Sequence, residues 1–470
     1  MPNAPEQYLR RIPSVDDVLA VCEKHGLTSS FPRWILLEAT REVLSEKRRA
    51  LLISTFPENL ENVDLSPEGI VRSVREQACK IQGPFLRRVI NATGVVVHTN
   101  LGRSPLSRRV LDQLTEVSLS YSTLEFDLEK GERGSRQEIL AGLVRRLTGA
   151  EECLVVNNNA AGVLLALDTL ACGKEVIVSR GQLVEIGGSF RIPDVMRKSG
   201  AKLVEVGTTN KTRISDYEEA VGEHTALFLK VHTSNFKIVG FVEEVAGEEL
   251  VKLGRRLQIP VMEDLGSGTL VDLSKYGLSH EPTVLESLSS GIDVITFSGD
   301  KLLGSSQSGF VVGKAELIRA MKKNPLTRAL RPDKLTLAVL EATLRLYLEG
   351  RIEEIPTLRM LTLPLSELSR RAETLLETVR TGLDDPSQAS CEEDVSEVGG
   401  GALPLQQLPT RVIALRSPRL SPNALEVSFR KYPVPVIGRI QKGRFVLDVR
   451  TLLDEDLEPV TQACHEILNG

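Results

Sequence analysis

Six short runs rich in valine and isoleucine constrain the fold of this chain more than any other feature. Longer amphipathic stretches separate them, and the runs are 153–156, 175–178, 226–231, 260–264, 294–297 and 309–312. Continuous apolar runs of this kind are typical of strands that are buried on both faces of a sheet. The intervening lengths leave room for crossover helices, so the sequence predicts an α/β domain with a mostly parallel sheet.

The chain of 470 residues is too long for a single core, so we expect two or three domains. Apolar residues at helical spacing follow Ser14, run from Trp34 to Leu52, and resume after Pro67, a residue favoured at a helix start. These patterns predict a helical N-terminal domain over residues 1–80, followed by a large α/β domain over residues 81–350.

The pattern changes again toward the C-terminus. A helical pattern from Leu335 to Leu348 leads out of the large domain, and strand-like runs return from Arg411 onward. Residues 384–409 lack a regular pattern and contain the triplet Gly399–Gly401, so they predict a loop. We therefore expect a small C-terminal domain over residues 351–470.

Composition limits the partners, the metal chemistry and the location that we expect for the protein. With 58 basic and 63 acidic residues, bulk charge does not indicate a nucleic-acid binder, although a local basic surface could still bind RNA. The six cysteines form no CxxC pair and do not cluster with histidine, so we expect free thiols and no metal site. We find no signal-peptide pattern, and no apolar run approaches the roughly 18 residues that a membrane span requires. A cytoplasmic protein is the resulting expectation.

Lys301 lies just beyond the apolar run 294–297, in a position that suits catalysis. Open α/β sheets bind ligands at the carboxyl ends of their strands, where a partly desolvated lysine amine has a lowered pKa and can form a Schiff base. The hydroxyl of Ser298, three residues earlier, could reach a phosphate oxygen. A lysine after a strand is also an ordinary surface residue, so this segment alone does not define a site.

Asp264 ends another apolar run and leads into the flexible turn 265–268, 37 residues before Lys301. That separation equals one strand–helix–strand repeat. A carboxylate at a strand end could keep a pyridine nitrogen protonated, which makes the ring an electron sink. The alternative is an aspartate that caps a helix.

A small polar segment, Asn158, Asn159 and Ala160, follows the first apolar run and precedes an apolar helix. Free N–H groups and the helix dipole predict a phosphate site there, although the segment also fits a generic turn. The order of phosphate loop, Asp264 and Lys301, each at a strand end, predicts a pyridoxal 5'-phosphate site.

Three more polar residues, His232, Ser234 and Asn235, follow the run 226–231. His232 could cover the cofactor ring, and Ser234 or Asn235 could hydrogen-bond the ring hydroxyl. A lone histidine is more often structural, so both interpretations of His232 stay open.

Long motifs at these residues resemble bacterial selenocysteine synthase, the L-seryl-tRNA(Sec) selenium transferase family of fold type I pyridoxal phosphate enzymes. The motifs follow the family order, and they are 88–103, 181–193, the segments around His232 and Asp264, 298–304 and 328–334. One stretch departs from the family, because Gly304–Gly309 reads Gly-Ser-Ser-Gln-Ser-Gly where Gly-Gly-Pro-Gln-Ala-Gly is usual. The turn geometry after Lys301 is therefore open at this point.

The resemblance implies conversion of L-seryl-tRNA(Sec) to L-selenocysteinyl-tRNA(Sec) with selenophosphate. Lys301 would carry the cofactor and then act as general base, while the β-hydroxyl leaves as water and selenium adds to the β-carbon. Asp300 would assist proton transfer or only orient its loop. Selenophosphate requires fixed cations, and the candidates are Arg103, Arg328 and Arg331. Arg328 and Arg331 are three residues apart, so a helical turn would place both on one side; the alternative for each arginine is a surface ion pair.

The resemblance also implies that the N-terminal domain recognises the tRNA body, in a homo-oligomeric ring of dimers, a homodecamer. A modest basic face among comparable numbers of acids is compatible with recognition of RNA shape. A pyridoxal phosphate lyase for a small amino sugar or amino acid is the nearest rival, but it does not require an N-terminal domain of this size. A tRNA-binding protein with an inactive cofactor site is a second rival, which the intact Lys301 and Asp264 argue against.

Overall fold

The computed structural model describes residues 8–53, 63–186 and 190–470. The chain divides into two compact units, Met1–Arg88 and Val89–Gly470. The sequence-based boundaries at residues 80 and 350 are not tested by this division and stay predictions. Of the helices described, none combines the length and apolarity that crossing a membrane requires.

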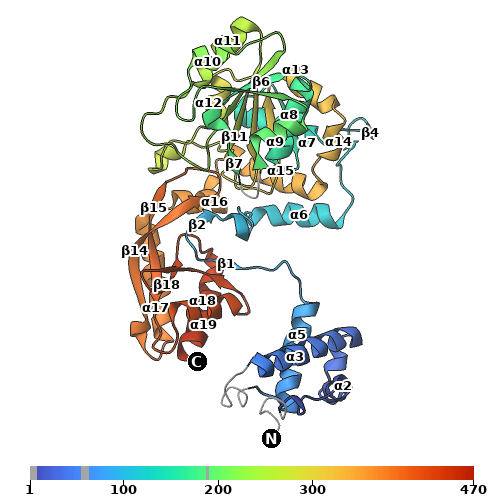
Figure 1. Ribbon diagram of the computed structural model, residues 1–470, viewed down its shortest axis with the longest axis vertical. Helices are drawn as coiled ribbons and strands as arrows, with labels where there is room; N and C mark the ends of the chain where they lie inside the picture. Colours follow the sequence, from blue (N-terminus) through green and yellow to red (C-terminus); the bar gives the residue numbers. More distant parts are fainter. Residues whose placement is uncertain (1–7, 54–62, 187–189) are drawn as a thin grey trace. The chain divides into compact units, whose positions relative to one another are not determined.

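The first unit is helical, as the spacing of its apolar residues predicts (Figure 1, blue). The longer helices in its described part are α2 (Val15–Lys24), α3 (Arg33–Ile53) and α5 (Pro67–Gln82). Ser14 and Asp17 form a capping box at the start of α2, and Ser66 caps α5 ahead of Pro67. Their apolar faces share one core, so packing rather than helix propensity alone stabilises them.

The second unit contains a seven-stranded sheet whose order is β5-β13-β12-β11-β10-β6-β9. All six predicted strands are confirmed in it, and β9 adds the seventh. Only β13 is antiparallel to its neighbours, which confirms a mostly parallel sheet. The strands are β5 (Glu152–Val156), β6 (Glu175–Ser179), β9 (Lys202–Val206), β10 (Thr225–Val231), β11 (Val261–Gly266), β12 (Val294–Ser298) and β13 (Gly309–Gly313).

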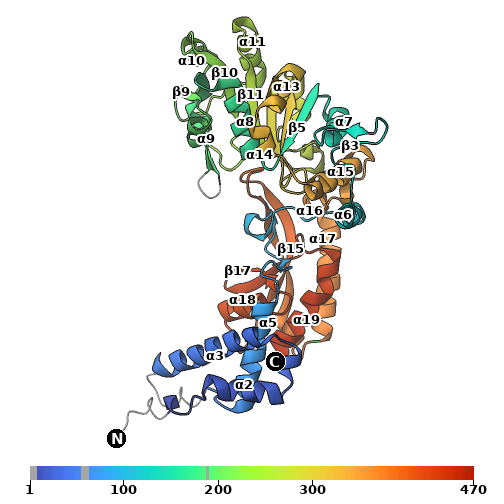
Figure 2. The ribbon, with the colours of Figure 1, turned by 90° about the vertical axis from the view of Figure 1, so that its right-hand side faces the viewer.

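Helices cover both faces of this sheet (Figures 1 and 2). On one face α7 (Glu138–Thr148), α11 (Gly247–Leu257), α12 (Val284–Ser289) and α15 (Lys334–Leu348) bury one apolar cluster. On the other, a second cluster is covered by α8 (Asn159–Ala171), α9 (Ile192–Lys198), α13 (Ala315–Lys323) and α14 (Leu326–Ala329). Burial on both faces explains why the strands are continuous apolar runs.

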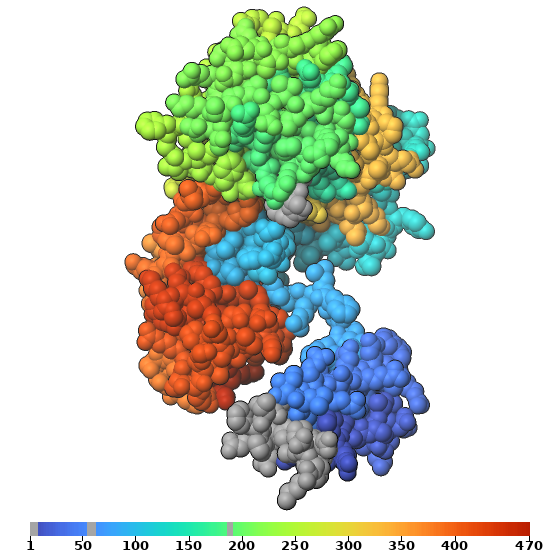
Figure 3. Space-filling view, in the orientation of Figure 1, coloured from blue at the N-terminus to red at the C-terminus, as the bar shows by residue number. Residues whose placement is uncertain are grey.

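A smaller five-stranded sheet, of order β17-β18-β15-β14-β2, is built mainly from the C-terminal part of the chain. Its strands are β2 (Val95–Val97), β14 (Ala389–Gly399), β15 (Gln407–Leu415), β17 (Arg439–Gln441) and β18 (Arg444–Asp448). The packed helices are α17 (Leu365–Thr381), α18 (Pro422–Lys431) and α19 (Leu457–Asn469). Figure 3 shows the early segment that contains β2, in light blue, set against the orange C-terminal part.

Further helices and short strand pairs complete the second unit. They are α6 (Arg109–Leu119), α10 (Ile214–Glu219), α16 (Pro356–Thr362) and the strand pairs β1 (Ile90–Asn91) with β16 (Val436–Ile437), β3 (Phe126–Asp127) with β4 (Glu132–Arg133), and β7 (Glu185–Ile186) with β8 (Phe190–Arg191). Part of the motif 181–193 falls on 187–189, outside the described residues.

The prediction of a loop over residues 384–409 is wrong for residues 389–399, which form β14, and for 407–409, where β15 begins. Acidic residues interrupt the apolar pattern of this strand, and in the structure they are paired with arginines. Glu393 lies opposite Arg411 in the β14–β15 register and pairs with it at 2.5 Å, and Asp394 pairs with Arg439 at 2.8 Å. Opposite charges paired across strands stabilise this part of the sheet, although its apolar pattern does not predict a strand.

The core of the large sheet yields a stability prediction. Phe310 is 1% exposed and stacks on Phe297, with ring centroids 5.0 Å apart. Phe310→Ala should lower the free energy of unfolding by about 3–5 kcal/mol, because it leaves a cavity in a close-packed interior. Urea denaturation followed by circular dichroism measures the loss. Phe310→Leu, which keeps most of the volume, should cost clearly less, and equal losses in the two variants would contradict this account.

Candidate active site

The carboxyl ends of the central strands bring the main predicted residues together. Asp264 lies near the end of β11, Lys301 follows β12, and Asn159 begins α8 after β5. Asn159 Nδ2 donates to Asp264 Oδ1 at 2.8 Å, and the charge of Lys301 acts on Asp264. The structure therefore brings Asp264, Lys301 and Asn159 together at one edge of the sheet.

Asp264 is a buried carboxyl group, 3% exposed. Burial raises its pKa, while the hydrogen bond from Asn159, the charge of Lys301 and the hydrogen bond from Thr296 lower it. The carboxylate thus has hydrogen-bond donors but lacks the full solvation that an ionised group requires. A cationic N–H group would complete this environment.

Lys301 is almost completely buried, at 6% exposure. Burial lowers the pKa of its amine, as does the charge of Arg103, whereas Asp264 and Asp300 act in the opposite direction. A lowered pKa increases the fraction of unprotonated amine near neutral pH, and the unprotonated amine is the form that attacks an aldehyde.

Arg103 and Asp300 form an ion pair beside Lys301. The Nη1 atom of Arg103 lies 2.6 Å from Asp300 Oδ2, and Arg103 has a left-handed backbone with φ 62°. Ser104 Oγ lies 2.9 Å from the carbonyl oxygens of both Asp300 and Lys301. The loop that carries Arg103 is therefore fixed against the lysine segment.

Arg328 and Arg331 do not share a helical turn. Helix α14 ends at Ala329, because Arg331 precedes Pro332 and a residue before proline disfavours the helical conformation. Arg328 is exposed, and Arg331 lies 3.5 Å from Glu125. The segment still adjoins the site, since the carbonyl of Leu330 accepts a hydrogen bond from the main chain of Asn157.

His232 and Asn235, which follow β10, form contacts with different partners. His232 Nε2 lies 3.2 Å from Oε1 of Glu281, which is 2% exposed, and its main-chain N–H donates to the carbonyl of Asp264. Asn235 Nδ2 donates to the carbonyl of Glu185. The Glu281 contact holds the imidazole in place, which suits both interpretations of His232.

Three buried polar atoms near Asp264 and Lys301 have no hydrogen-bond partner in the described part of the chain. They are Asn159 Oδ1, Ser234 Oγ and Ser267 Oγ. Orphaned buried oxygens are costly, so they indicate a bound polar group. Asn158 uses its own side chain to cap α8 through Ala161 N, which leaves first-turn N–H groups of α8 for a phosphate.

Pyridoxal phosphate fits this donor set. A protonated ring nitrogen would pair with Asp264, an aldehyde would meet Lys301, and a phosphate would suit the start of α8 near Asn158, Asn159 and Ala160. Ser298, the last residue of β12, is 5% exposed. Its hydroxyl has no hydrogen-bond partner among the described residues. Among the described residues, no cluster of histidine, cysteine or acidic side chains suits a metal ion.

Two of the three substituted residues in 304–309, Ser305 and Ser308, form local hydrogen bonds, whereas the buried Oγ of Ser306 has no partner among the described residues. Ser305 Oγ donates to Thr343 Oγ1 at 2.9 Å, and Ser308 Oγ donates to the carbonyl of Ser306. Main-chain bonds link Gly299 with Ser305 and Ser308 at 2.9 and 3.0 Å. The turn after Lys301 is therefore closed without the glycine and proline.

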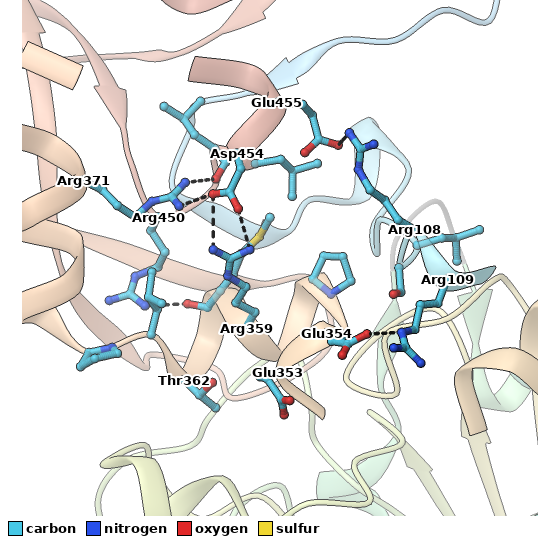
Figure 4. A pocket seen from close by; sticks show the side chains of 18 residues that line it. Arg108, Arg109, Glu353, Glu354, Arg359, Thr362, Arg371, Arg450, Asp454 and Glu455 are labelled. Carbon is cyan, nitrogen blue, oxygen red and sulfur yellow. Dashed lines mark hydrogen bonds and ion pairs between the residues drawn. The ribbon is translucent and has the colours of Figure 1, made fainter. Parts of the chain in front are cut away.

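A cavity of about 640 Å³ lies apart from these residues, between the start of α6, α16 and the segment after β18. Figure 4 shows its charged groups, in which Asp454 accepts from both Arg359 and Arg371 and Glu354 pairs with Arg109. Because these charges satisfy one another, we assign the chemistry to the Lys301 site and not to this cavity.

Sequence reasoning missed several residues of the site. Thr296 pairs with Asp264 in the β11–β12 register and donates to its Oδ1 at 3.1 Å, so aligning the two strands would have found it. Glu281 and Ser104 lie in irregular segments, and no sequence signal marks them. Gly266, with φ 67°, places its main chain beside Lys301.

The fold and the donor set together define a pyridoxal-phosphate-dependent enzyme of fold type I. A solved D-glucosaminate-6-phosphate ammonia-lyase has a similar fold, with a TM-score of 0.58, 21% identity, and 82% of this chain and 96% of that chain covered.

Two family models match the sequence. "L-seryl-tRNA selenium transferase" matches residues 89–453, and "Selenocysteine synthase N terminal" matches residues 9–48. The L-seryl-tRNA(Sec) selenium transferase of Geobacter sulfurreducens is 52% identical over 97% of this chain and 98% of its own length. That of Clostridium perfringens is 49% identical over 98% and 99%. The chain belongs to the L-seryl-tRNA selenium transferase family.

The electrostatics of Lys301 yield a prediction that needs no cofactor. The amine reacts only when unprotonated, so reductive methylation of Lys301 should reach half its maximal rate at a pH below the ordinary lysine value of 10.5. In Asp264→Asn, which removes the charge that raises the pKa of Lys301, the midpoint should fall further, by about one pH unit. Peptide mass spectrometry over a pH series measures both, with exposed Lys442 as the internal reference. An unchanged or higher midpoint in Asp264→Asn would contradict the assignment.

Proposed function

We propose that this protein converts L-seryl-tRNA(Sec) to L-selenocysteinyl-tRNA(Sec), with selenophosphate as the selenium donor and pyridoxal phosphate on Lys301. The observation that carries the proposal is the buried pair of Lys301 and Asp264, in which burial lowers the pKa of the lysine amine. The pair lies in a chain of this family. The bound cofactor supplies an electron sink that acidifies the Cα–H bond of the seryl group.

The residues of the chain perform the remaining tasks. Lys301 Nζ would be the base that takes the Cα proton of the seryl group. Asp264 would hold the ring nitrogen, with Asn159 and Thr296 orienting its carboxylate. Asp300 orients Arg103 through their ion pair, and proton transfer by Asp300 is the alternative role.

The remaining cofactor contacts follow from the same edge of the sheet. The phosphate would be held by the start of α8, at Asn158, Asn159 and Ala160, and by Ser298. Ser234, whose buried hydroxyl lacks a partner in the described structure, would bond the ring hydroxyl, and His232 would cover the ring.

Selenophosphate is a multivalent anion, and Arg103, Arg328 and Arg331 are the cations proposed to hold it. Arg103 lies beside Lys301, and the main-chain link from Leu330 to Asn157 holds the segment of the other two near the phosphate loop. Guanidinium groups match phosphate oxygens in a bidentate manner.

The helical N-terminal domain, proposed over residues 1–80, would recognise the body of the tRNA. Support comes from the match of residues 9–48 to the N-terminal family model. The large domain over 81–350 would hold the catalytic site, and the small domain over 351–470 would complete it. We further propose a cytoplasmic homo-oligomer, a ring of dimers of the homodecamer kind.

A pyridoxal phosphate lyase for a small amino sugar or amino acid is the alternative function. It would use the same Lys301 and Asp264, but it gives no role to the family-matched N-terminal segment. Retention of seryl-tRNA(Sec) on the purified protein separates the two, since a lyase for small molecules has no reason to bind it.

Conversion of purified seryl-tRNA(Sec) with selenophosphate tests the function directly. The wild type should form selenocysteinyl-tRNA(Sec), and Lys301→Ala should form none above background, because it lacks the general base. Chromatography of the released amino acid measures the product. Tight binding of seryl-tRNA(Sec) by Lys301→Ala is the control for folding, and a wild type without product would overturn the proposal.

The arginines provide a second prediction. Arg328→Ala and Arg331→Ala should each raise the KM for selenophosphate by roughly tenfold or more, the effect of losing a charge-assisted hydrogen bond. The KM for seryl-tRNA(Sec) should change little. Arg345→Ala, an exposed arginine paired with Glu341 on α15, is the matched control. Equal KM values for selenophosphate in all three variants would remove these arginines from the site.

A further inference from the structure

The turn after β14 reaches the active-site lysine from the other sheet. Strand β14 ends at Gly399, and the N–H of Gly400 donates to the carbonyl of Val97 at 3.1 Å. Gly401 comes next, with a left-handed backbone of φ 82°. The glycine triplet that the sequence marks only as part of a loop therefore lies at the site.

The main chain of Gly401 packs directly against the side chain of Lys301. A Cβ atom at Gly401 would lie 2.6 Å from Lys301 Nζ and 3.0 Å from its Cε. A Cβ at Gly266 would lie 3.7 Å from the same Nζ atom, which is an ordinary contact. Two glycines thus border the amine, Gly266 at the end of β11 and Gly401 in the turn after β14, and of the two only Gly401 lies closer than a Cβ atom permits.

The position of Gly401 is fixed by its neighbours in the turn. Ala402 and Leu403 are 1% and 5% exposed and pack in one apolar cluster with Leu302, the residue after the lysine. Leu403 itself has φ 47°, an unfavourable backbone for a residue with a side chain. Because the buried neighbours hold the turn in this strained conformation, the main chain of Gly401 cannot easily move away from the lysine.

We propose that Gly401 is a positioning residue of the active site. Its missing side chain leaves space beside Lys301 Nζ, which a cofactor held on the lysine and the amino group of the aminoacyl substrate would require. This inference rests on the proposed function, because the space has a purpose only if Lys301 carries the cofactor.

The short distance between residue 401 and Lys301 Nζ matters most when the lysine carries the cofactor. A free lysine is flexible at its end and can swing away from a methyl group at residue 401. A lysine tied to a ring that Asp264 and the start of α8 hold cannot move in that way, so a methyl group would clash with the linkage. Gly401→Ala should therefore weaken cofactor attachment far more than it perturbs the free chain.

A double-mutant cycle on the full-length protein tests the proposal. Pyridoxal phosphate is titrated into the wild type, Gly401→Ala, Lys301→Ala and the double variant, and bound cofactor is measured by absorbance and by equilibrium dialysis. Gly401→Ala should weaken binding by roughly tenfold or more when Lys301 is present, as expected for overpacking. In the Lys301→Ala background, the same substitution should change binding by less than about twofold.

Gly443→Ala is the matched control. Gly443 has φ 72° and open space around it, so the substitution introduces the same left-handed alanine without a clash. It should leave cofactor binding unchanged, and thermal unfolding should show similar losses of stability in Gly443→Ala and Gly401→Ala without cofactor.

The outcomes separate the inference from the function on which it rests. No cofactor binding by the wild type would overturn the proposed function. A wild type that binds normally, with equal effects of Gly401→Ala in both backgrounds, would show a merely structural glycine and overturn the inference alone. Normal binding by Gly401→Ala would overturn it as well.

Discussion

The site depends on the burial of two opposite charges, Asp264 and Lys301, at one edge of the large sheet. Each is almost inaccessible to water, and burial moves their pKa values in opposite directions, up for the acid and down for the amine. Neither shift favours the charged form, and leaving buried charges incompletely paired costs several kcal/mol, typically about 3–5 when a partner is removed. This cost supports the proposal that both groups serve the chemistry of the site.

The rest of the structure follows from holding this pair. Strands β11 and β12 fix Asp264 and Lys301 one crossover apart, and Thr296 lies across the register to orient the carboxylate. Asn159 brings the start of α8 to the same point. The loop with Arg103 and the turn with Gly401 then close over the lysine from segments far apart in the chain.

Sequence reasoning reached the features that apolar patterns encode. The six strands and the helices α2, α3, α5 and α15 follow from burial and periodicity, and the meeting of Asp264, Lys301 and Asn159 follows from the rule that ligands bind at strand ends. The family membership of the chain confirmed the resemblance that its motifs had suggested.

What sequence reasoning missed depends on pairing between distant segments. The sequence pattern predicts a loop where β14 lies, because its acidic residues pair with their arginines only in the folded sheet. The helical turn expected through Arg331 ends early because Pro332 follows. Gly401 gave no signal of its role, since the residue that it contacts lies 100 positions earlier in the chain.

The central claim is that the cofactor is carried by Lys301 and by no other lysine. Borohydride reduction of the pyridoxal-phosphate-loaded wild type, followed by proteolysis and mass spectrometry of the peptides, tests it most directly. The account predicts a single stable phosphopyridoxyl adduct, on the peptide that contains Lys301. An adduct on a different lysine, with Lys301 unmodified, would contradict it.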